Sequence, residues 1–503
     1  MFNLEVLAFV LYFIAMMSIG VVFFFRSKNA SEKEYFLGGR SMGPWVTALS
    51  AQASDMSAWL LMGLPGSIMA FGLGQVWIGI GLALGTIANW IFVAKPLRRF
   101  SKAANDSITL PQYLTNRFAS QSHALQIICA VIFLVCFTIY VASAFVAGAT
   151  VFVTVFPTLQ YSTAMLVFAL IIIVYTFLGG YKAVCWTDFF QGMLMLVALL
   201  AVPIVVVLTK ELDAAALNNV YVNAADGTEY VFGQSLFGAS ATDILSGLAW
   251  GLGYFGMPHI IVRFMGIQKP SQVKTASTGA IVWVVLSLGS AIAFAILGRT
   301  FLLKDGTALA ALLLPAGNQQ NIFIVLAQEI FPPLVAGLLL AAIVAAAMST
   351  ADSQLLASAS AFANDVYKPV LRKNAGNREM LWASRLVVVA IAVVALLIAS
   401  NPNSGTIMGL VENAWGVFGA AFGPVILLSL YWKRLTFSGA VAGIATGALV
   451  DILWLVLLSG TGIYEIIPGF FAGLIASLVV SLCSPVPGRD VEELFDRAAQ
   501  PEI

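Results

Sequence analysis

The chain alternates between long apolar runs and short polar connections along almost its whole length. Thirteen runs approach or exceed the roughly 20 residues that a helix needs to cross a bilayer. We therefore expect an all-α membrane protein that forms one membrane domain over residues 1–503. Its thirteen predicted spans are 4–25, 43–71, 74–94, 124–156, 162–178, 186–209, 242–263, 275–303, 323–366, 379–399, 406–432, 437–458 and 464–482.

Composition excludes several classes of protein. Of the 503 residues, 60% are hydrophobic and 10% are charged, whereas a soluble domain carries about 25% charged residues. This leaves too little polar surface for a soluble enzyme, a nucleic-acid binder or a disordered scaffold. The net charge of +1 indicates no polyanionic partner. The lipid bilayer is the only partner that composition requires, and we expect neither nucleic acid nor an obligate protein partner.

The reactive side chains are sparse. Four cysteines and two histidines are too scattered for a disulfide framework or for a zinc or haem site. An integral membrane enzyme would need a catalytic constellation within the bilayer, and no nucleophile motif is present. The chain has no GxxxxGKS phosphate loop, so ATP-driven pumping has no support either. We expect no enzyme activity and no organic cofactor.

Basic residues gather on one side of the predicted spans. Of the 25 lysines and arginines, 22, including Arg263, lie at the connections after odd-numbered spans or in the C-terminal tail 484–503; the others are Lys210, Arg299 and Lys304. Basic residues favour the cytoplasmic side. We therefore expect the N-terminus outside and the short tail in the cytoplasm, in a plasma membrane that in bacteria is the inner membrane.

Two spans contain stretches that interrupt a helix. Span 2 has a polar stretch, 50–59, around Asp55, and span 7 has Gly251, Gly253, Gly256 and Pro258 within eight residues. A serine-rich packing face and a plain kink are the simpler explanations. Asp55 nevertheless needs a reason, because a carboxylate at membrane depth is costly and normally functional.

The two interrupted spans are five spans apart and so cross the membrane in opposite directions. Interrupted helices at matching places are typical of transporters built from inverted repeats. We expect spans 2–6, residues 43–209, and spans 7–11, residues 242–432, to form two inverted five-helix repeats. Spans 4–25 and 437–482 would be peripheral.

Span 9 adds a polar face. Ala346, Ser349, Thr350 and Ser353 follow the i, i+3, i+4, i+7 spacing and so share one side of a helix. Small residues also favour close helix packing, which is the simpler interpretation. The alternative is a site for a hard cation, because such ions take hydroxyl, carbonyl and carboxylate oxygens.

Several motifs together identify a resemblance. They are Leu37-Gly38-Gly39-Arg40-Ser41, Ser54-Asp55-Met56-Ser57, Trp250-Gly251-Leu252-Gly253-Tyr254-Phe255-Gly256 with Pro258-His259, and Met348-Ser349-Thr350. Over nearly its whole length the chain resembles the sodium/solute symporter family. The resemblance implies a LeuT-type core of two inverted repeats and secondary transport driven by sodium, the only metal ion that we expect.

The resemblance also implies residue roles. Sodium would lie between the break in span 2 and span 9, bound by the carbonyls of Ala53, Met56 and Ala346 and the hydroxyls of Ser349 and Thr350, with Asp55 and Ser57 also important for sodium. The substrate pocket would use Trp59, Tyr140, Trp250, Tyr254 and Pro258. Ala58 departs from the family pattern where glycine is expected, and Asp352 where a hydroxyl residue is expected.

The residues themselves agree with a small zwitterion. Trp250, Tyr254 and Pro258 recur at i, i+4 and i+8, which predicts one stripe along a helix. Aromatic faces suit the saturated ring and the cationic nitrogen of proline, and free amides at a helix break suit its carboxylate. Packing or interfacial aromatics remain an alternative, and other small zwitterions fit the same description.

A second cation or proton site is predicted on the cytoplasmic side of the first, at Asp188, Asp352 and Ser353. Two carboxylates there are costly unless a cation lies between them or one stays protonated. Alternatively, Asp188 only caps its helix.

The patterns together with the resemblance predict a secondary active transporter that couples inward sodium flux to uptake of a small zwitterion, with L-proline as the expected solute. The alternatives are a sodium symporter for another small organic solute and a cation channel. A channel would need a continuous polar path, whereas the polar positions here are discrete.

Overall fold

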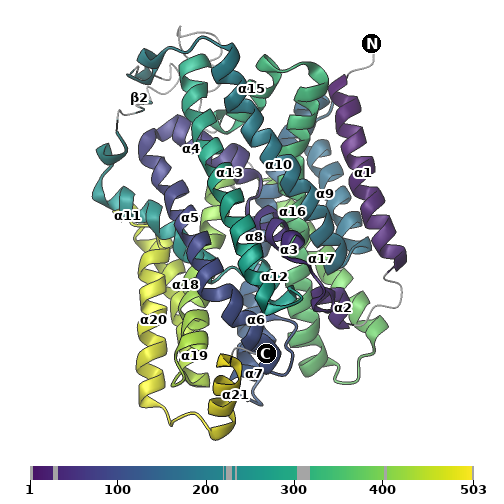
Figure 1. Cartoon of the computed structure of the whole chain (residues 1–503), viewed down its shortest axis with the longest axis vertical. Coiled ribbons are helices and arrows are strands. Elements are labelled where there is room, and N and C mark those ends of the chain that lie inside the picture. The colour runs from purple at the N-terminus through teal and green to yellow at the C-terminus, as the bar shows by residue number, and fades with distance from the viewer. Residues whose placement is uncertain are drawn as a thin grey trace.

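The computed structural model describes residues 4–26, 32–218, 220–222, 229–230, 232, 235–302, 318–401 and 405–500. These residues form an elongated bundle of helices (Figure 1). The helices are α1 (Leu4–Arg26), α2 (Glu32–Leu37), α3 (Pro44–Asp55), α4 (Leu64–Phe71), α5 (Val76–Ala88), α6 (Lys95–Ala103), α7 (Leu110–Arg117), α8 (Ala124–Val155), α9 (Tyr161–Leu178), α10 (Tyr181–Thr209), α11 (Ala241–Ala249), α12 (Pro258–Gly266), α13 (Val273–Leu302), α15 (Ile322–Ile330), α16 (Pro333–Ala361), α17 (Asn377–Ala399), α18 (Ile407–Tyr431), α19 (Phe437–Leu457), α20 (Ile466–Cys483) and α21 (Arg489–Ala499).

Shorter elements join or interrupt these helices. Two strands of two residues each, β1 (Tyr221–Val222) and β2 (Glu229–Tyr230), pair antiparallel. The 3-10 and π segments are η1 (Gly38–Arg40), η2 (Trp59–Gly63), η3 (Leu73–Gln75), η4 (Asn89–Ala94), η5 (Ala214–Asn218), η6 (Leu236–Gly238), η7 (Trp250–Phe255), η8 (Pro270–Gln272), η9 (Asn318–Asn321), η10 (Phe362–Leu371) and η11 (Ser459–Thr461).

The predicted spans all correspond to helices. Within the described residues, ten helices are long and apolar enough to cross a membrane, and a bent pair, residues 241–255 with α12, makes an eleventh. The other two predicted spans are α9, whose apolar part is shorter, and the interrupted span 2, which is divided between α3 and α4. The prediction of an all-α membrane protein is confirmed.

The break in span 2 lies at residues 56–58. The amide of Met56 still donates to the carbonyl of Gln52, at 2.9 Å, but the amide of Ser57 donates to Asp55 O, at 3.0 Å, and not to Ala53. Serine and aspartate favour such departures because their side chains compete for backbone hydrogen bonds. The carbonyl of Ala53 is therefore left without its helical donor.

The break in span 7 follows from its glycines and its proline. The helix α11 ends at Ala249, the chain tightens into the 3-10 segment η7, and Pro258 starts α12. The two parts are bent by 43°. Glycine lowers helix stability and proline lacks the amide that would continue the hydrogen-bond ladder.

Two long, uninterrupted helices form the buried centre of the bundle. In α16 and α18, 83% of the most apolar window is buried inside the protein, against 28% in α1 and α17. The first two are therefore central, and the last two are peripheral. The helix α10 packs against α16 and α3, so span 6 is in contact with span 9.

Glycines allow α5 and η7 to cross with their backbones in contact. A Cβ atom added at Gly251 would lie 2.4 Å from Gly81 O and 3.2 Å from the Cα atom of Gly85. Only small residues permit this approach within a membrane.

Gly251→Ala is therefore expected to reduce the free energy of unfolding by about 1–3 kcal/mol, the usual cost of overpacking. The apparent melting temperature of the detergent-solubilised protein measures the effect. Gly289→Ala is the matched control, because nothing lies within 4 Å of an added Cβ there and alanine favours the helix. Equal melting temperatures for the two variants would contradict the close crossing.

The Gly-Gly-Arg motif forms a tight turn ahead of α3. Gly38 and Gly39 have φ values of 63° and 62°, in the left-handed region that glycine adopts without strain. Arg40 Nε then donates to Asp106 Oδ1 at 2.8 Å. Although partial burial raises it, the hydrogen bonds from Lys33 and Arg40 hold the pKa of Asp106 below its ordinary value.

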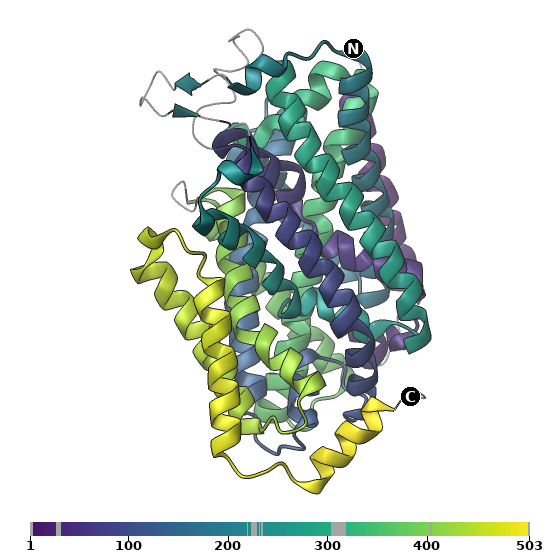
Figure 2. The same ribbon diagram turned by 60° about the vertical axis from the view of Figure 1, so that its left-hand side comes forward.

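The two ends of the bundle differ (Figure 2). The hairpin of β1 and β2 lies at one end, which we call the hairpin end. At the other end, which we call the basic end, the amphipathic helix α21 packs against α6, with the rings of Phe495 and Phe100 5.2 Å apart. Lys433 Nζ lies 2.7 Å from Asp496 Oδ2. The tail is therefore folded back onto the bundle.

Candidate functional site

The broken end of α3 faces the middle of α16. The hydroxyl of Ser349 donates to Ala53 O at 2.7 Å and to Ala346 O at 3.2 Å. The hydroxyl of Thr350 donates to Ala53 O at 3.4 Å. All four residues are buried. Two carbonyls and two hydroxyls that were predicted as sodium ligands therefore meet, and this is the oxygen set that hard cations prefer.

Met56 and Ser57 complete the break. The amide of Leu60 donates to Ser57 O at 3.0 Å, so the carbonyl of Met56 also lacks the donor that a continuous helix would supply. The hydroxyl of Ser57 accepts weakly from the amide of Trp59, at 3.4 Å. The unwound segment thus leaves backbone carbonyls free beside the cluster on α16.

Asp55 lies at the last turn of α3 and is fully buried. Its Oδ2 accepts a hydrogen bond of 2.5 Å from the hydroxyl of Tyr254. Within the described residues, its Oδ1 has no hydrogen-bond partner. A buried carboxylate with an unused oxygen is costly unless a cation or a proton balances it. The hydrogen bond also joins the two interrupted helices directly.

A buried arginine lies next to this oxygen cluster, on the side of the basic end. Arg263 was counted among the connection residues in the sequence, but it lies inside the bundle on α12 and is 1% exposed. Its Nη2 lies 3.2 Å from Asp188 Oδ2 and also donates to Ser353 Oγ. The prediction of Arg263 as a connection residue was wrong, because the bend after η7 directs α12 into the bundle.

The carboxylates of the predicted second cation site have different surroundings. Asp188 is in the third turn of α10, which begins at Tyr181, and its Oδ2 accepts from Ser50 and Ser54 at 2.7 and 3.0 Å. It is not a helix cap, so that alternative is wrong. Asp352 Oδ1 accepts from the hydroxyl of Ser353 at 3.3 Å, and in the described part of the chain Asp352 forms no ion pair.

The predicted aromatic stripe is divided. Trp250 stacks on Trp415, with ring centroids 6.4 Å apart, and lines a cavity near the hairpin end. Pro258 lines a different cavity, towards the basic end. Tyr254 lies between them, 5.0 Å from the ring of Trp415. The prediction of one common stripe was wrong, because η7 is a 3-10 segment and α12 follows after a bend.

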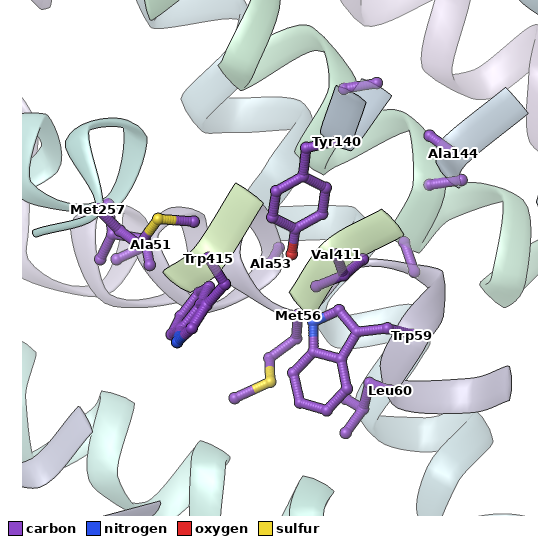
Figure 3. Packing of buried hydrophobic residues seen from close by; sticks show 14 of the residues in the cluster. Ala51, Ala53, Met56, Trp59, Leu60, Tyr140, Ala144, Met257, Val411 and Trp415 are labelled. Atoms are coloured by element: carbon purple, nitrogen blue, oxygen red, sulfur yellow. The ribbon is translucent and has the colours of Figure 1, made fainter. Parts of the chain in front are cut away.

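Tyr140, Trp59 and Trp415 lie around one region of the core (Figure 3). The hydroxyl end of Tyr140 is directed toward Met56 and Trp59. In the described structure it makes no hydrogen bond of standard geometry, although it is buried. The indole of Trp415 lies to one side of this group and donates from Nε1 to Trp250 O at 2.8 Å. The three side chains supply aromatic faces, and Tyr140 adds a buried hydroxyl beside Ser57 and Trp59.

Two cavities lie on either side of these residues. One, of about 600 Å³ near the hairpin end, is lined by Gly63, Trp250, Met408 and Glu412 among others. Gly63 packs against Trp59, since an added Cβ would lie 3.2 Å from Trp59 Cβ. The other cavity, towards the basic end, is only about 30 Å³. The larger of these two cavities therefore lies towards the hairpin end.

Two residues of this region were missed in the sequence. Trp415 lies in an apolar span where a tryptophan is no different from any packing residue, so no local signal marked it. Arg263 did carry a signal, because it follows His259 by one helical turn and a basic residue within a span is normally functional. His259 itself is buried, with Nε2 3.1 Å from Ser54 O.

Comparison with known proteins gives a consistent result. The model of the family described as "Sodium:solute symporter family" matches residues 35–447. The sodium/proline symporter of Escherichia coli strain K12 is 43% identical over 490 residues, covering 97% of this chain and 95% of the relative. The high-affinity proline transporter PutP of Bacillus subtilis strain 168 is 42% identical and covers 96% of this chain and 98% of the relative.

A solved structure shares the fold. It is the substrate-bound, outward-open state of a sodium-coupled sialic acid symporter, with a TM-score of 0.76 at 18% sequence identity. The match covers 96% of this chain and 98% of that chain. The expected architecture of two inverted repeats of the LeuT type is therefore confirmed.

Proposed function

Because the chain belongs to the sodium:solute symporter family, we propose that it is a secondary active transporter that couples inward sodium flux to the uptake of L-proline. The observation that carries the proposal is the oxygen cluster of Ala53, Ala346, Ser349 and Thr350 at the broken end of α3. The names of the full-length relatives support proline as the solute. The coupling ion needs no organic cofactor.

The carbonyl of Met56, Asp55 and Ser57 join this cluster as the sodium site. Tyr140, Trp59, Trp250 and Tyr254 form the wall of the solute site, and Trp415 joins them. The aromatic faces suit a saturated ring with a cationic nitrogen, and the buried hydroxyl of Tyr140 can donate a hydrogen bond to a carboxylate. Pro258 supports the pocket by starting α12 at the break and does not line its hairpin-end wall.

The protein spans the membrane many times, and in a bacterium this is the inner membrane. We place the hairpin end outside and the basic end in the cytoplasm, because basic loops favour the cytoplasmic side. The N-terminus is then outside and the C-terminal tail inside. In this orientation the larger cavity lies on the outer side of the site, from which a transporter loads sodium and solute before uptake.

Uptake of radiolabelled proline into proteoliposomes tests the function. An inward sodium gradient is expected to drive accumulation, and equal sodium on both sides is not. Lithium and proton gradients in place of sodium identify the coupling ion, and a panel of amino acids identifies the solute, which matters because Ala58 departs from the family pattern. Counterflow is expected of a carrier and excludes a channel. Uptake that is independent of every cation gradient is incompatible with the proposal.

Ser349→Ala is expected to raise the sodium concentration needed for half-maximal uptake by about tenfold, since one lost ligand oxygen corresponds to roughly 1.4 kcal/mol. The proline concentration for half-maximal uptake at saturating sodium should change less. Ser358→Ala is the matched control, because that hydroxyl is buried on the same helix and has no partner within the described residues. An unchanged sodium requirement in Ser349→Ala would remove this residue from the site.

A further inference from the structure

The guanidinium of Arg263 is held by four helices. Its Nη2 reaches Asp188 on α10, at 3.2 Å, and Ser353 on α16. Its Nε donates to Ser50 Oγ on α3 at 3.2 Å, and its Nη1 donates to His259 O on its own helix α12 at 2.7 Å. Both charged side chains of the ion pair are 2% exposed or less. This is a fixed positive charge in the interior of the transporter.

The groups around the guanidinium form a cation-binding set in their own right. One carboxylate oxygen, Asp188 Oδ2, is surrounded by the hydroxyls of Ser50 and Ser54 at 2.7 and 3.0 Å. Ser54 Oγ lies 3.0 Å from the hydroxyl of Ser353. Hydroxyl and carboxylate oxygens are the ligands that a sodium ion would also use, but here an arginine occupies the middle of the set.

This set lies directly beside the proposed sodium site. Ser54 follows Ala53 on α3, and Ser353 is one helical turn beyond Ser349 on α16. One turn of a helix is about 5.4 Å. A second free cation within the set itself would touch the fixed guanidinium and be repelled in a medium of low dielectric constant, whereas at the sodium site one turn away the charge of Asp188 offsets that of Arg263.

We propose that Arg263 is a built-in cation that takes the place of a second coupling ion beside Asp188, so that the protein binds one sodium ion per transport cycle. The proposal rests on the proposed sodium-coupled function. Arg263 touches neither sodium nor solute and is a positioning residue for the cycle. Its charge balances Asp188, whereas Asp352 forms no ion pair in the described part of the chain.

Removing the guanidinium should therefore create a second sodium site. In Arg263→Met the carboxylate of Asp188 loses its balancing charge, and an unbalanced charge at membrane depth recruits a cation. Equilibrium binding of radioactive sodium to the purified protein is expected to rise from about one ion per chain to about two. Where the variant transports, the reversal potential in proteoliposomes should show the same change in the sodium-to-proline ratio.

Two further variants separate charge from structure. Arg263→Lys keeps a cation at the position, and the double variant Arg263→Met with Asp188→Asn removes both charges, so each should bind about one sodium ion. Asp188→Asn alone removes the ion-pair partner of the guanidinium and should weaken sodium binding at the neighbouring site by about tenfold or more. The double variant should restore that affinity, which a merely structural role for the pair does not predict.

The number of sodium ions bound by the wild-type protein is the first test of the inference. Two sodium ions bound per chain would overturn the inference even if sodium-driven proline uptake is intact. One ion in Arg263→Met that still binds proline would also overturn it. If Arg263→Met does not fold, unaltered sodium affinity in Asp188→Asn would likewise overturn the inference. If the wild-type protein shows no sodium-driven uptake, the proposed function is wrong. The number of bound sodium ions then still tests the role of Arg263 by itself.

Discussion

Asp55→Asn is expected to abolish sodium-driven proline uptake while the protein still reaches the membrane. The substitution removes a full charge that is fully buried and has one oxygen, Oδ1, without a partner in the described structure. Loss of one partner from a buried pair of charges costs about 3–5 kcal/mol, so sodium affinity should fall by about 100-fold or more. Uptake in proteoliposomes over a range of sodium concentrations measures the effect.

Asp365→Asn is the matched control. Asp365 is also a fully buried carboxylate, but it lies on η10 and accepts hydrogen bonds from Thr109 Oγ1 at 2.7 Å and Gln126 Nε2 at 3.3 Å. We expect its replacement to leave the sodium dependence of uptake unchanged, whatever it does to stability. Near-normal sodium dependence in Asp55→Asn would contradict the assignment of this residue.

Trp415→Ala is expected to abolish proline binding and to destabilise the protein. Trp415 is 1% exposed, stacks on Trp250, packs edge-on against Tyr254 and donates to Trp250 O. Truncating a buried tryptophan costs about 3–5 kcal/mol of unfolding free energy. Thermal unfolding of the detergent-solubilised protein and equilibrium binding of radiolabelled proline measure the two effects.

Two variants separate the effect on proline binding from the effect on stability. Trp415→Phe keeps an aromatic face but loses the hydrogen bond to Trp250 O and part of the packed ring area, so we expect weaker proline binding with more of the stability retained than in Trp415→Ala. Trp382→Ala removes a tryptophan that is 48% exposed at the surface of α17, and it should leave proline binding intact. Normal proline affinity in Trp415→Ala would place the solute elsewhere.

The helix breaks could be predicted from the sequence because their causes are local. The hydroxyl of Ser57 accepts from the amide of Trp59, two residues further on, and Pro258 has no amide that could continue the hydrogen-bond ladder of η7. The face that contains Ser349 and Thr350 was also predictable, because α16 is a continuous helix and its spacing of 3.6 residues per turn holds. Its partner Ala53 came only from the family resemblance and is supported by the hydrogen bonds of the structure.

The arrangement of the aromatic residues could not be predicted in the same way. The stripe of Trp250, Tyr254 and Pro258 assumed a single α-helix, but a 3-10 segment has three residues per turn, so positions four apart no longer share a face. The bend of 43° then separates Pro258 from the other two. Trp415 and the ion pair of Arg263 with Asp188 depend on which helices pack together, and no local pattern encodes that.

The hydrogen bond between Tyr254 and Asp55 has a thermodynamic consequence. One group belongs to the proposed solute wall and the other to the proposed sodium site, and 2.5 Å separates their oxygens. If sodium at Asp55 holds Tyr254 in the orientation that the solute prefers, sodium raises the affinity for proline by some factor. Reciprocity then requires that proline raises the affinity for sodium by the same factor. Measuring the affinity for each ligand at several fixed concentrations of the other gives two independent values of this factor, which should be equal. In Tyr254→Phe both values should fall towards one, which means no coupling.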